Sequence, residues 1–430
     1  MGILKAVRGT RDLLPPETAL WNRVEATARA VFARYGFGEI RTPIFEDTAL
    51  FARSVGEETD IVSKEMYTWD DRARADSDSA QSLTLRPENT AGVVRAYIEH
   101  KLADTGMLQK LFYIGPQFRR ERPQRGRYRQ FWQIGAEVLG PAWSGSDSPL
   151  RDAEVLEMLS TFLNELGVKG WKLEVNSVGS STDRPRYVAA LREALTPVKA
   201  RMSADNQRRA ETNPLRVLDS KAPEDQGIID GLPKMADFLD DASREHFAQV
   251  LAALDACGVA YTVNPRLVRG LDYYTRTTFE FTVPDGSGLG TQNALLGGGR
   301  YDGLSEMLGG PKAPGIGFAI GEDRLILTLQ AQAEAATEPK LDAFVAPMGI
   351  AQNAAALVLA KDLRSAGLAI EVGDGSFRLK KSFEAADKLA RRMVILGEDE
   401  IASGILTVKD FSAGEQTKVP RADLADFLRG

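Results

Sequence analysis

The chain has 430 residues and a formal net charge of −6, with 43% hydrophobic and 27% charged residues, values ordinary for a globular protein of about two to four domains. No apolar run approaches the roughly 20 residues of a membrane helix, the N-terminus lacks a signal-peptide core, and a single cysteine excludes an internal disulfide, so we expect a cytoplasmic protein. The negative charge opposes non-specific binding to DNA, and a nucleic-acid partner would have to meet local basic patches.

The first predicted element is a helix that follows a Pro-Pro pair. Apolar residues recur at helical spacing between Leu20 and Tyr35, and Gly36 provides the stop. A short strand over 37–41 is predicted next. It runs into Pro43, which cannot donate to a sheet ladder and therefore fits the end of a strand.

Small polar residues predict loops over 74–80 and 141–149. The segment from about 180 to 259 is charged and mostly helical in pattern, and it interrupts strand-rich sequence on both sides. We interpret it as an insertion into a first domain that spans residues 1–330. Residues 331–339, which include Glu-Ala-Ala-Thr-Glu-Pro, predict a linker.

The region from 340 to 430 shows alternating strand and helix patterns. The expected elements are strands over 342–347, 368–372 and 393–396 and helices over 351–366 and 383–390. This alternation is typical of a small α/β domain with a mostly parallel sheet.

Residues 111–139 predict a long antiparallel hairpin, with strands over 111–118 and 128–139. Side chains alternate between the two faces of a strand. One face of the second strand carries Phe131, Gln133, Gly135 and Glu137, and the other carries Gln130, Trp132, Ile134, Ala136 and Val138. The second set favours a core, whereas the first set is suited to the floor of a small-molecule pocket. Spacing alone leaves a solvated hairpin of mixed charge as an equal alternative.

Five arginines lie between the two strands, within residues 119–127. Guanidinium groups pair well with phosphate, so this concentration favours a ligand with several phosphates.

Two further segments combine glycine with arginine and tyrosine. In Leu-Val-Arg-Gly-Leu-Asp-Tyr-Tyr-Thr-Arg, residues 267–276, Gly270 permits a bend that would aim Arg269 and the tyrosines into a cleft, although ordinary strand packing explains the same pattern. In 297–303, three consecutive glycines predict a turn at which backbone approaches a ligand, although a flexible loop looks the same.

Residues 315–325 predict a short strand that turns at Gly321 into a helix beginning near Glu322. Arg324 then lies in the first helical turn, where backbone amides already favour an anion. A surface arginine at a helix start is the common alternative.

Glu88 and Thr90 place a carboxylate and a hydroxyl two residues apart, and together they can hold an ammonium group. The same stretch also reads as a helix N-terminus with Pro87 in the first position. Both interpretations can hold at once.

Together these segments resemble the histidyl-tRNA synthetases, a family of class II aminoacyl-tRNA synthetases, over nearly the whole chain. The helix–strand unit ending at Pro43 resembles the first class motif, 112–140 the second and 315–327 the third. The Arg-Gly-Leu-Asp-Tyr-Tyr segment and 297–303 resemble two histidine-specific signatures, and 213–219 resembles part of the family's insertion. The resemblance implies an α+β fold with a six-stranded antiparallel catalytic sheet, a helical insertion, a C-terminal anticodon-binding α/β domain and a homodimer.

The resemblance also implies that the chain activates L-histidine with ATP and loads it onto tRNA(His). The residues implied for histidine are Glu88, Asn89, Thr90, Gln133, Glu137, Arg269, Tyr273 and Tyr274. Glu88, Thr90 and Gln133 would bind the ammonium group. Glu137 and Tyr274 would grip the two imidazole nitrogens.

The residues implied for ATP are Arg119, Glu121, Arg127, Phe131 and Arg324. Phe131 would stack on adenine, with Glu121 near it. Arg119, Arg269 and Arg324 are the expected catalytic residues, because in-line attack on the α-phosphorus needs alignment and charge stabilisation rather than a protein nucleophile. Mg²⁺ would be bound mainly through the ATP phosphates, and no protein metal ligand is predicted.

Three positions depart from the family pattern. Asn89 stands where bacterial relatives usually have Gly, Trp132 where His is frequent, and Asp323 where class II enzymes usually carry Glu. Trp132 falls on the core face of its strand, so little effect is expected. Asp323 keeps the charge but has a shorter reach.

Three alternatives compete with a histidine-specific ligase. A non-catalytic regulatory subunit of histidine biosynthesis generally lacks the C-terminal domain and the Arg-Gly-Leu-Asp-Tyr-Tyr segment, both of which this chain has. A module that senses uncharged tRNA lies within a much longer chain. The third alternative is a class II synthetase for another amino acid, against which Glu137 and Tyr274 argue because a small apolar substrate would leave them unpaired.

Overall fold

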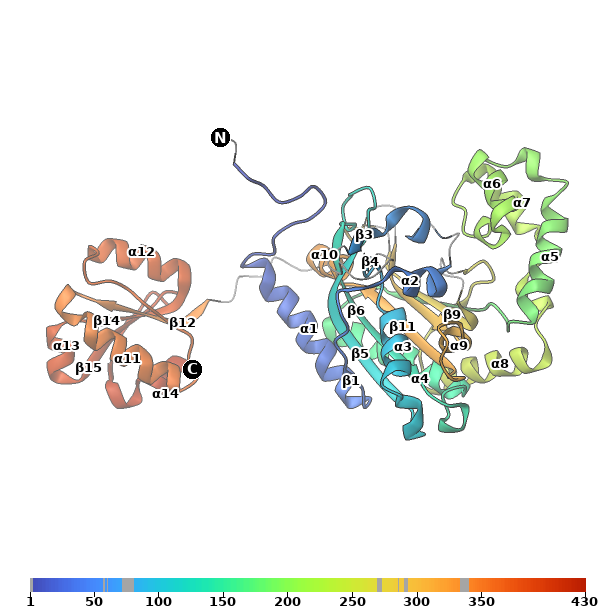
Figure 1. Cartoon of the computed structure of the whole chain (residues 1–430). Coiled ribbons are helices and arrows are strands. Elements are labelled where there is room, and N and C mark those ends of the chain that lie inside the picture. The colour runs from blue at the N-terminus through green and yellow to red at the C-terminus, as the bar shows by residue number, and fades with distance from the viewer. Residues whose placement is uncertain are drawn as a thin grey trace. The chain divides into compact units, whose positions relative to one another are not determined.

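The computed structural model describes residues 3–56, 59, 61–71, 81–268, 273–284, 286–289, 293–332 and 340–430. The chain divides into two compact units, unit 1 (Met1–Glu334) and unit 2 (Ala335–Gly430) (Figure 1). The loop expected over 74–80, most of the linker expected over 331–339, and Arg269 lie outside the described residues. Within the described ranges, no helix has the length and apolar character needed to cross a membrane.

Unit 1 is built around an eight-stranded sheet of order β1-β5-β6-β11-β10-β9-β7-β8. Its strands are β1 (Gly38–Glu39), β5 (Gln109–Phe118), β6 (Gln130–Leu139), β7 (Lys172–Ser177), β8 (Tyr261–Val263), β9 (Thr275–Thr282), β10 (Ala294–Arg300) and β11 (Gly315–Gly321). The six inner strands pair antiparallel, which confirms the implied sheet. A short parallel strand is added at each edge, and one of these is the strand expected over 37–41, reduced to two residues.

Strands β5 and β6 form the predicted hairpin, with Tyr113 opposite Gly135 in register. Alternation along β6 separates the two faces as predicted. Ile134, Ala136 and Val138 are buried in the main core. The opposite face of the sheet is left for the polar residues.

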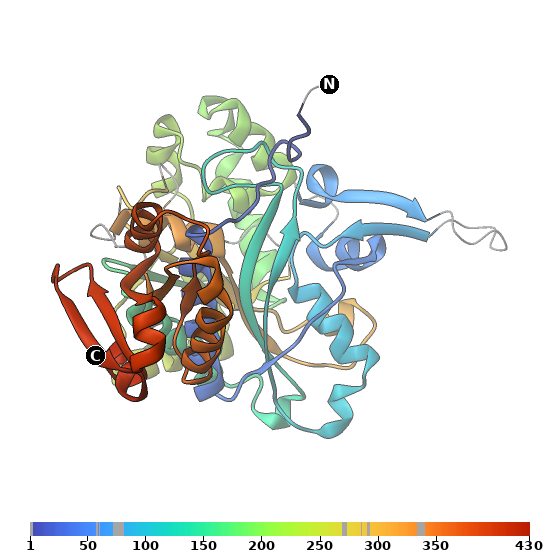
Figure 2. The same ribbon diagram turned by 90° about the vertical axis from the view of Figure 1, so that its left-hand side faces the viewer.

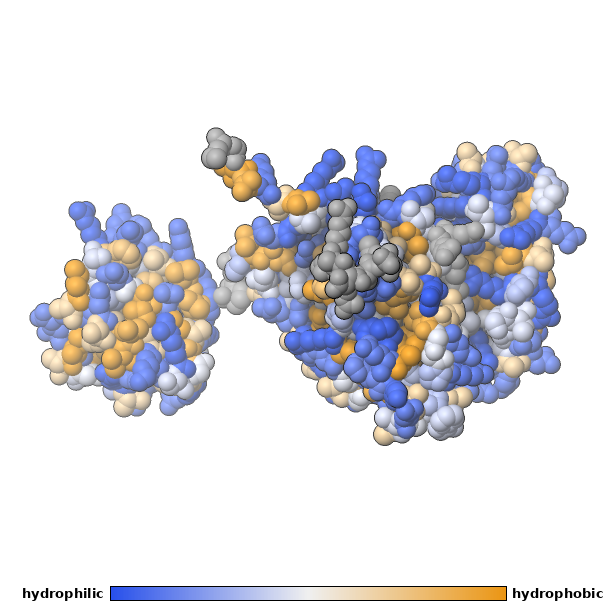
Figure 3. Space-filling model, viewed as in Figure 1, coloured by the Kyte–Doolittle hydropathy of each residue, from blue (hydrophilic) through white to orange (hydrophobic). Residues whose placement is uncertain are grey.

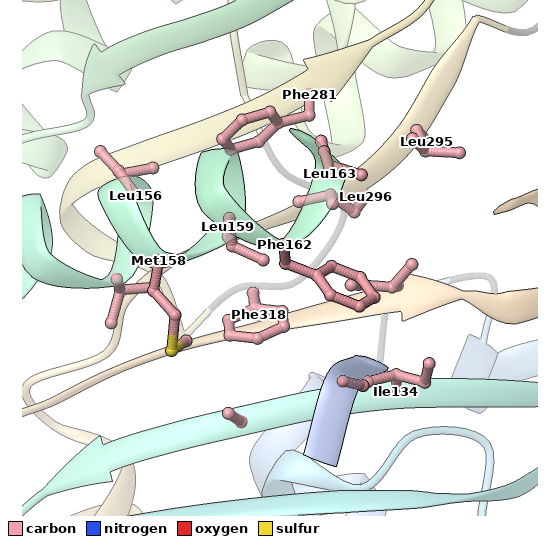
Figure 4. Close-up of a cluster of buried hydrophobic side chains, with 14 of the residues drawn as sticks. Ile134, Leu156, Met158, Leu159, Phe162, Leu163, Phe281, Leu295, Leu296 and Phe318 are labelled. Carbon is pink, nitrogen blue, oxygen red and sulfur yellow. The ribbon is translucent and has the colours of Figure 1, made fainter. Parts of the chain in front are cut away.

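Two 18-residue helices, α1 (Glu17–Arg34) and α4 (Pro149–Leu166), contribute buried residues to this core. Apolar side chains of α4 meet those of β6, β9, β10 and β11 (Figure 4). Helix α1 ends as predicted before Gly36, whose φ of +79° is a conformation that favours glycine. The loop expected over 141–149 contains a 3₁₀ turn, Ala142–Ser144, and its last residue already begins α4.

A smaller antiparallel sheet of order β2-β4-β3 precedes the hairpin in sequence. Its elements are β2 (Phe45–Asp47), α2 (Thr48–Val55), β3 (Tyr67–Asp71), β4 (Gln81–Leu85) and α3 (Thr90–Glu99). Strands β3 and β4 extend away from the body of unit 1 (Figure 2). Helices α9 (Leu304–Met307) and α10 (Glu322–Gln332) follow β10 and β11.

The predicted insertion is helical and lies between β7 and β8 in sequence. It contains α5 (Asp183–Leu195), α6 (Ala204–Thr212), α7 (Gln226–Asp230) and α8 (Asp241–Ala256). Helices α5, α6 and α7 form a lobe beside the sheet (Figure 1) with a core of its own that includes Tyr187, Leu191 and Val217. Helix α8 instead buries Val250 and Leu254 in the main core, so it ties the insertion to the sheet.

Unit 2 has a five-stranded sheet of order β13-β12-β14-β15-β16. Its elements are β12 (Leu341–Pro347), α11 (Asn353–Ser365), β13 (Ile370–Val372), α12 (Leu379–Leu389), β14 (Ala390–Leu396), α13 (Glu398–Ser403), β15 (Ile405–Asp410), β16 (Gln416–Pro420) and α14 (Leu424–Arg429). The first three strands are parallel, but β15 and β16 are antiparallel. The expectation of a mostly parallel sheet holds for β12, β13 and β14, but β15 runs in the opposite direction between β14 and β16, because the last hairpin turns directly instead of crossing over through a helix.

A buried ionic cluster joins α4, α8 and β10. The Arg300 guanidinium pairs with the Asp152 carboxylate and also donates to the Ser146 carbonyl at 2.9 Å, while His246 Nε2 lies 2.8 Å from the same carboxylate. Arg300 and Asp152 have no exposed side-chain surface. Burial alone would raise the pKa of Asp152, but Arg300 and His246 lower it to about 2. The cluster thus fastens the insertion to the sheet through charge.

We predict that Asp152→Asn lowers the free energy of unfolding of unit 1 by about 3–5 kcal/mol, because it leaves a buried guanidinium without its counter-charge. Denaturant unfolding measures the loss. The matched control is Asp205→Asn, whose ion pair with Arg208 is 69% exposed on both sides and should matter little. Equal stability of the two variants would contradict a structural role for the buried pair.

Candidate active site

A cleft opens on the polar face of the main sheet. Most residues that the sequence singled out lie along it, namely Glu88, Thr90, Arg119, Glu121, Arg127, Phe131, Gln133, Tyr273, Tyr274 and Arg324. Residues from α3, from the β5–β6 hairpin and from the start of α10 thus meet in one place. Arg269, the residue expected at the reacting phosphate, lies outside the described part of the chain.

Glycines of the central strands lie beneath the side chains that line the cleft. In register across three strands, Glu137 of β6 lies opposite Gly317 of β11, which lies opposite Gly299 of β10. A Cβ on Gly317 would come within 1.7 Å of the Glu137 carboxylate, and a Cβ on Gly299 within 2.8 Å of the Tyr274 ring. The glycines therefore make room for the functional side chains.

This placement corrects the interpretation of 297–303. The three glycines form the middle of strand β10 rather than a turn. Of the three, Gly297 lines the cleft, so the close approach of a ligand to the backbone stays a prediction at that position. Gly135 of β6 makes room in the same way for Tyr113, since a Cβ at Gly135 would lie 2.3 Å from the Tyr113 hydroxyl.

The Glu137 carboxylate has no exposed surface and does not itself line the cleft, but it lies directly behind Thr90 and Tyr301, which do. One oxygen accepts a hydrogen bond from the Thr90 hydroxyl at 2.7 Å and the other from the Tyr301 hydroxyl at 2.6 Å. Burial raises the pKa of Glu137 to about 8, although both hydrogen bonds act against the rise. A ligand that brings an N–H donor or a positive charge would favour the ionised form.

Tyr301 was not among the predicted site residues. It lines the cleft, and its ring lies 5.9 Å from that of Tyr273 in an edge-to-face arrangement. The signal in the sequence was its position directly after the glycine strand, but the contact with Glu137 joins residues 164 apart. Such a long-range contact could not be inferred from spacing.

Glu88 lies just before helix α3 and accepts from the backbone N–H groups of Thr90 at 2.7 Å and Ala91 at 3.0 Å. The helix begins at Thr90, so the expectation that Pro87 occupies its first position is wrong. Burial raises the pKa of Glu88, with the two backbone hydrogen bonds opposing the rise. A buried anion and the Thr90 hydroxyl thus face the cleft together.

Asn89 is placed differently from its neighbours. It lies at the N-cap of α3 and does not line the cleft. Its side-chain oxygen accepts from Thr42 at 2.6 Å and from Arg86 at 3.4 Å. The assignment of the Asn89 side chain to histidine binding therefore does not fit its orientation.

The other end of the cleft is basic. The Arg119 guanidinium donates to the Pro87 carbonyl at 2.9 Å and lies 5.3 Å from the Phe131 ring centroid. Glu121 forms an ion pair of 3.3 Å with Arg127. Burial lowers the pKa of Arg324, and the nearby positive charge of Arg127 lowers it further. Two cations brought close together favour a polyanionic ligand.

The five arginines of 119–127 do not act as one cluster. Arg119 and Arg127 line the cleft, whereas the other three are not part of its wall. Arg120 instead lies over the Tyr67 ring at 5.7 Å. Within the described part of the chain, no three His, Cys, Asp or Glu side chains gather closely enough to hold a metal ion.

The chain was compared with known proteins. Residues 9–325 match the family described as histidyl-tRNA synthetase, and residues 342–430 match the anticodon binding domain. The chain belongs to the histidyl-tRNA synthetase family. A protein of Koribacter versatilis named Histidine–tRNA ligase is 67% identical over 99% of this chain and 96% of its own length.

Two further comparisons agree. A protein of the same name from Solibacter usitatus is 53% identical over 99% of both chains. A crystal structure of apo histidyl-tRNA synthetase from S. aureus is 37% identical, covers 100% of both chains and has a TM-score of 0.80. The family resemblance inferred from the sequence is thereby confirmed.

The departures from the family pattern have structural explanations at two positions. Trp132 packs on the core face as expected, with its ring 6.5 Å from that of Trp21. Asp323 accepts from the Trp132 backbone N–H at 3.1 Å and pairs with Arg11 at 3.0 Å. The short carboxylate is therefore held on both oxygens.

Glu322 is a buried carboxylate that sequence reasoning placed only as a helix start. It has no exposed surface, and neither oxygen has a hydrogen-bond partner among the described residues. Burial raises its pKa to about 9, with Glu25 and Asp323 adding to the rise. Folding therefore favours its protonated form.

This shift predicts a pH-dependent stability. Because the folded-state pKa lies above the unfolded value, the folded protein binds the proton more tightly, and stability falls as pH rises toward 9. Glu322→Gln should raise the melting temperature, and its advantage should grow between about pH 6 and pH 9. The control is exposed Glu193→Gln on α5. A gain from Glu322→Gln that does not vary with pH would contradict the protonation of Glu322.

Proposed function

We propose that the chain is a histidine–tRNA ligase, which activates L-histidine with ATP and transfers it to the 3′ end of tRNA(His). The observation that carries the proposal is the Glu137 carboxylate, buried directly behind Thr90 and Tyr301 of the cleft wall, in a cleft whose other end is basic. Family membership supports the same conclusion. One end suits an imidazole, and the other suits a triphosphate.

At the amino-acid end, Glu88, Thr90 and Gln133 would bind the substrate ammonium group. Glu137 and Tyr274 would grip the imidazole nitrogens, and Tyr273 would line the same pocket. A substrate of similar size without ring nitrogens would bring no N–H donor to Glu137, and a site built to hydrogen-bond its substrate discriminates against such an analogue on the order of 10⁴–10⁵.

At the ATP end, Phe131 would stack on adenine with Glu121 beside it. Arg119 would hold the α-phosphate, with Arg127 and Arg324 toward the terminal phosphates. Histidine's carboxylate would then attack the α-phosphorus in line and expel pyrophosphate, so the chain must align two anions and stabilise the developing charge. Mg²⁺ would be held mainly through the phosphates, adding positive charge there. Arg269 stays a predicted catalytic cation on sequence grounds.

The regulatory alternative is less well supported. Relatives named Histidine–tRNA ligase match 99% of the chain, including unit 2, at 67% and 53% identity. The cleft also keeps both the polar residues proposed for histidine and the arginines proposed for ATP, which an inactive relative does not need. Family membership further leads us to propose a cytoplasmic homodimer.

The decisive test of this proposal is Glu137→Gln, which keeps the side-chain size but loses the charge. Histidine-dependent ATP–pyrophosphate exchange should show a rise in KM for histidine of at least about 100-fold, because a charged hydrogen bond to the ring is weakened in a buried site. The KM for ATP should change little. The matched control is exposed Glu165→Gln on α4.

The exchange assay is run with a panel of amino acids. Activation of another amino acid by the unaltered chain, or unchanged histidine activation by Glu137→Gln, would overturn the assignment.

We also propose that unit 2 binds the anticodon of the tRNA. Its predicted basic cluster comprises Arg378, Lys380, Lys381, Lys388, Arg391 and Arg392. Arg378, Lys380 and Lys381 are exposed next to exposed Phe377, and Lys381 lies 4.5 Å from that ring. Basic side chains beside an exposed aromatic suit a single-stranded loop with unstacked bases.

Two members of the cluster serve unit 2 itself. Arg391 pairs with Asp342. Arg392 pairs with Asp410 at 2.9 Å and donates to the Leu428 carbonyl at 3.0 Å. The exposed members of the cluster near Phe377 are therefore the better candidates for RNA contacts. Figure 3 shows hydrophobic and hydrophilic side chains mixed over the visible surface of unit 2.

The triple variant Arg378→Ala, Lys380→Ala, Lys381→Ala should weaken tRNA binding and reduce the salt dependence of log Kd by about one unit for each lost phosphate contact. Adenylate formation should persist. A triple variant of equal charge change, Lys361→Ala, Lys418→Ala, Arg421→Ala, serves as the control on other elements. Normal tRNA charging and an unchanged salt slope in the first variant would show that this cluster does not bind RNA.

A further inference from the structure

The N-terminal segment packs against the basic connection between β5 and β6. The Gly9 carbonyl accepts from the Arg129 backbone N–H at 2.7 Å, and the Arg129 guanidinium donates to the Arg8 carbonyl at 3.3 Å. Gly9 has a φ of +91°, and a Cβ there would lie 2.8 Å from the Arg129 side chain. The segment is therefore seated closely on this connection.

Arg11, two residues later, bridges parts of the cleft wall. Its guanidinium donates to Asp323 at 3.0 Å and to Glu17 at 2.8 Å, and it lies over the Tyr128 ring at 4.8 Å from the centroid. Asp323 and Tyr128 both line the cleft, whereas Arg11 does not. From behind the cleft wall, Arg11 thus holds both the Asp323 carboxylate at the start of α10 and the Tyr128 ring of the β5–β6 connection.

The contact between Arg11 and Asp323 matters for the cleft because Asp323 carries a negative charge in its wall. The carboxylate is 4% exposed, and the next residue is Arg324, which faces the cleft. Burial raises the pKa of Asp323, while the Trp132 N–H and Arg11 oppose the rise. Without Arg11, the wall would present an uncompensated negative charge at the end of the cleft where the proposed function places the ATP phosphates.

We propose that Arg11 is a positioning residue for ATP. It neutralises Asp323 and fixes Tyr128, and so leaves the Arg324 charge available to the phosphates. This inference rests on the proposed function, because it takes the basic end of the cleft to hold a triphosphate. It assigns the N-terminal segment a part in substrate binding in addition to packing.

The experiment compares Arg11→Gln, Asp323→Asn and the double variant in histidine-dependent ATP–pyrophosphate exchange. Arg11→Gln should raise KM for ATP by about 10-fold, since one charged contact beside the phosphates is lost, with kcat and KM for histidine changed by less than about 3-fold. The double variant should recover most of the ATP affinity, because Asn keeps an acceptor for the Trp132 N–H but carries no charge. Arg11→Lys should rescue partly, since it keeps the charge but loses the fork.

The matched control is Arg34→Gln at the end of α1, which breaks an ion pair with Glu165 that is exposed on both sides. It should leave all kinetic constants unchanged. A purely structural role for Arg11 predicts instead that kcat, both KM values and the melting temperature shift together, and that the double variant is worse than either single one.

The two hypotheses fail in different ways. If the unaltered chain shows no histidine-dependent exchange, the proposed function is wrong. If it does, and Arg11→Gln leaves KM for ATP unchanged or Asp323→Asn gives no rescue, the positioning role of Arg11 is wrong.

Discussion

Strand β6 has to satisfy two environments at once. One face supplies Ile134, Ala136 and Val138 to the core beneath α1 and α4. The other places Gln133 in the cleft wall and Glu137 directly behind that wall. A shift of one residue in its register would exchange these faces, burying the amide and the carboxylate in the apolar core. Pairing along ten residues with β5 fixes that register and therefore the chemistry of the cleft.

Glycine then makes room for the side chains around the cleft. A central sheet normally projects a side chain at every second residue of each strand. In the row that contains Glu137, the next two strands contribute Gly317 and Gly299, so the carboxylate and the Tyr274 ring occupy space that neighbouring side chains would fill. Conformational freedom is not the reason for glycine at these strand positions, which need the absence of a Cβ.

The local features of this arrangement could be predicted from the sequence, and the long-range ones could not. Alternation in 130–139, helical spacing in α1 and the strand–turn–helix at Gly321 each follow from neighbouring residues. The hydrogen bond from Tyr301 to Glu137 and the ion pair of Arg11 with Asp323 join residues 164 and 312 positions apart, and a single sequence carries no signal for them. The β15–β16 hairpin was not predicted, although β15 alternates buried Leu406 and Val408 with less buried residues, and only β16 is largely polar.

The start of helix α10 shows how one turn can serve three environments. Successive residues of an α-helix point about 100° apart. Glu322 enters the interior toward α1, Asp323 meets Arg11 and the Trp132 backbone, and Arg324 faces the cleft. The turn is thus fixed by packing on one side and by charge on another, so Arg324 reaches the cleft from a backbone that has little freedom to move. Preorganisation of this kind is what an anion-binding arginine requires, because its charge acts at full strength only where no reorientation is needed when the phosphates arrive.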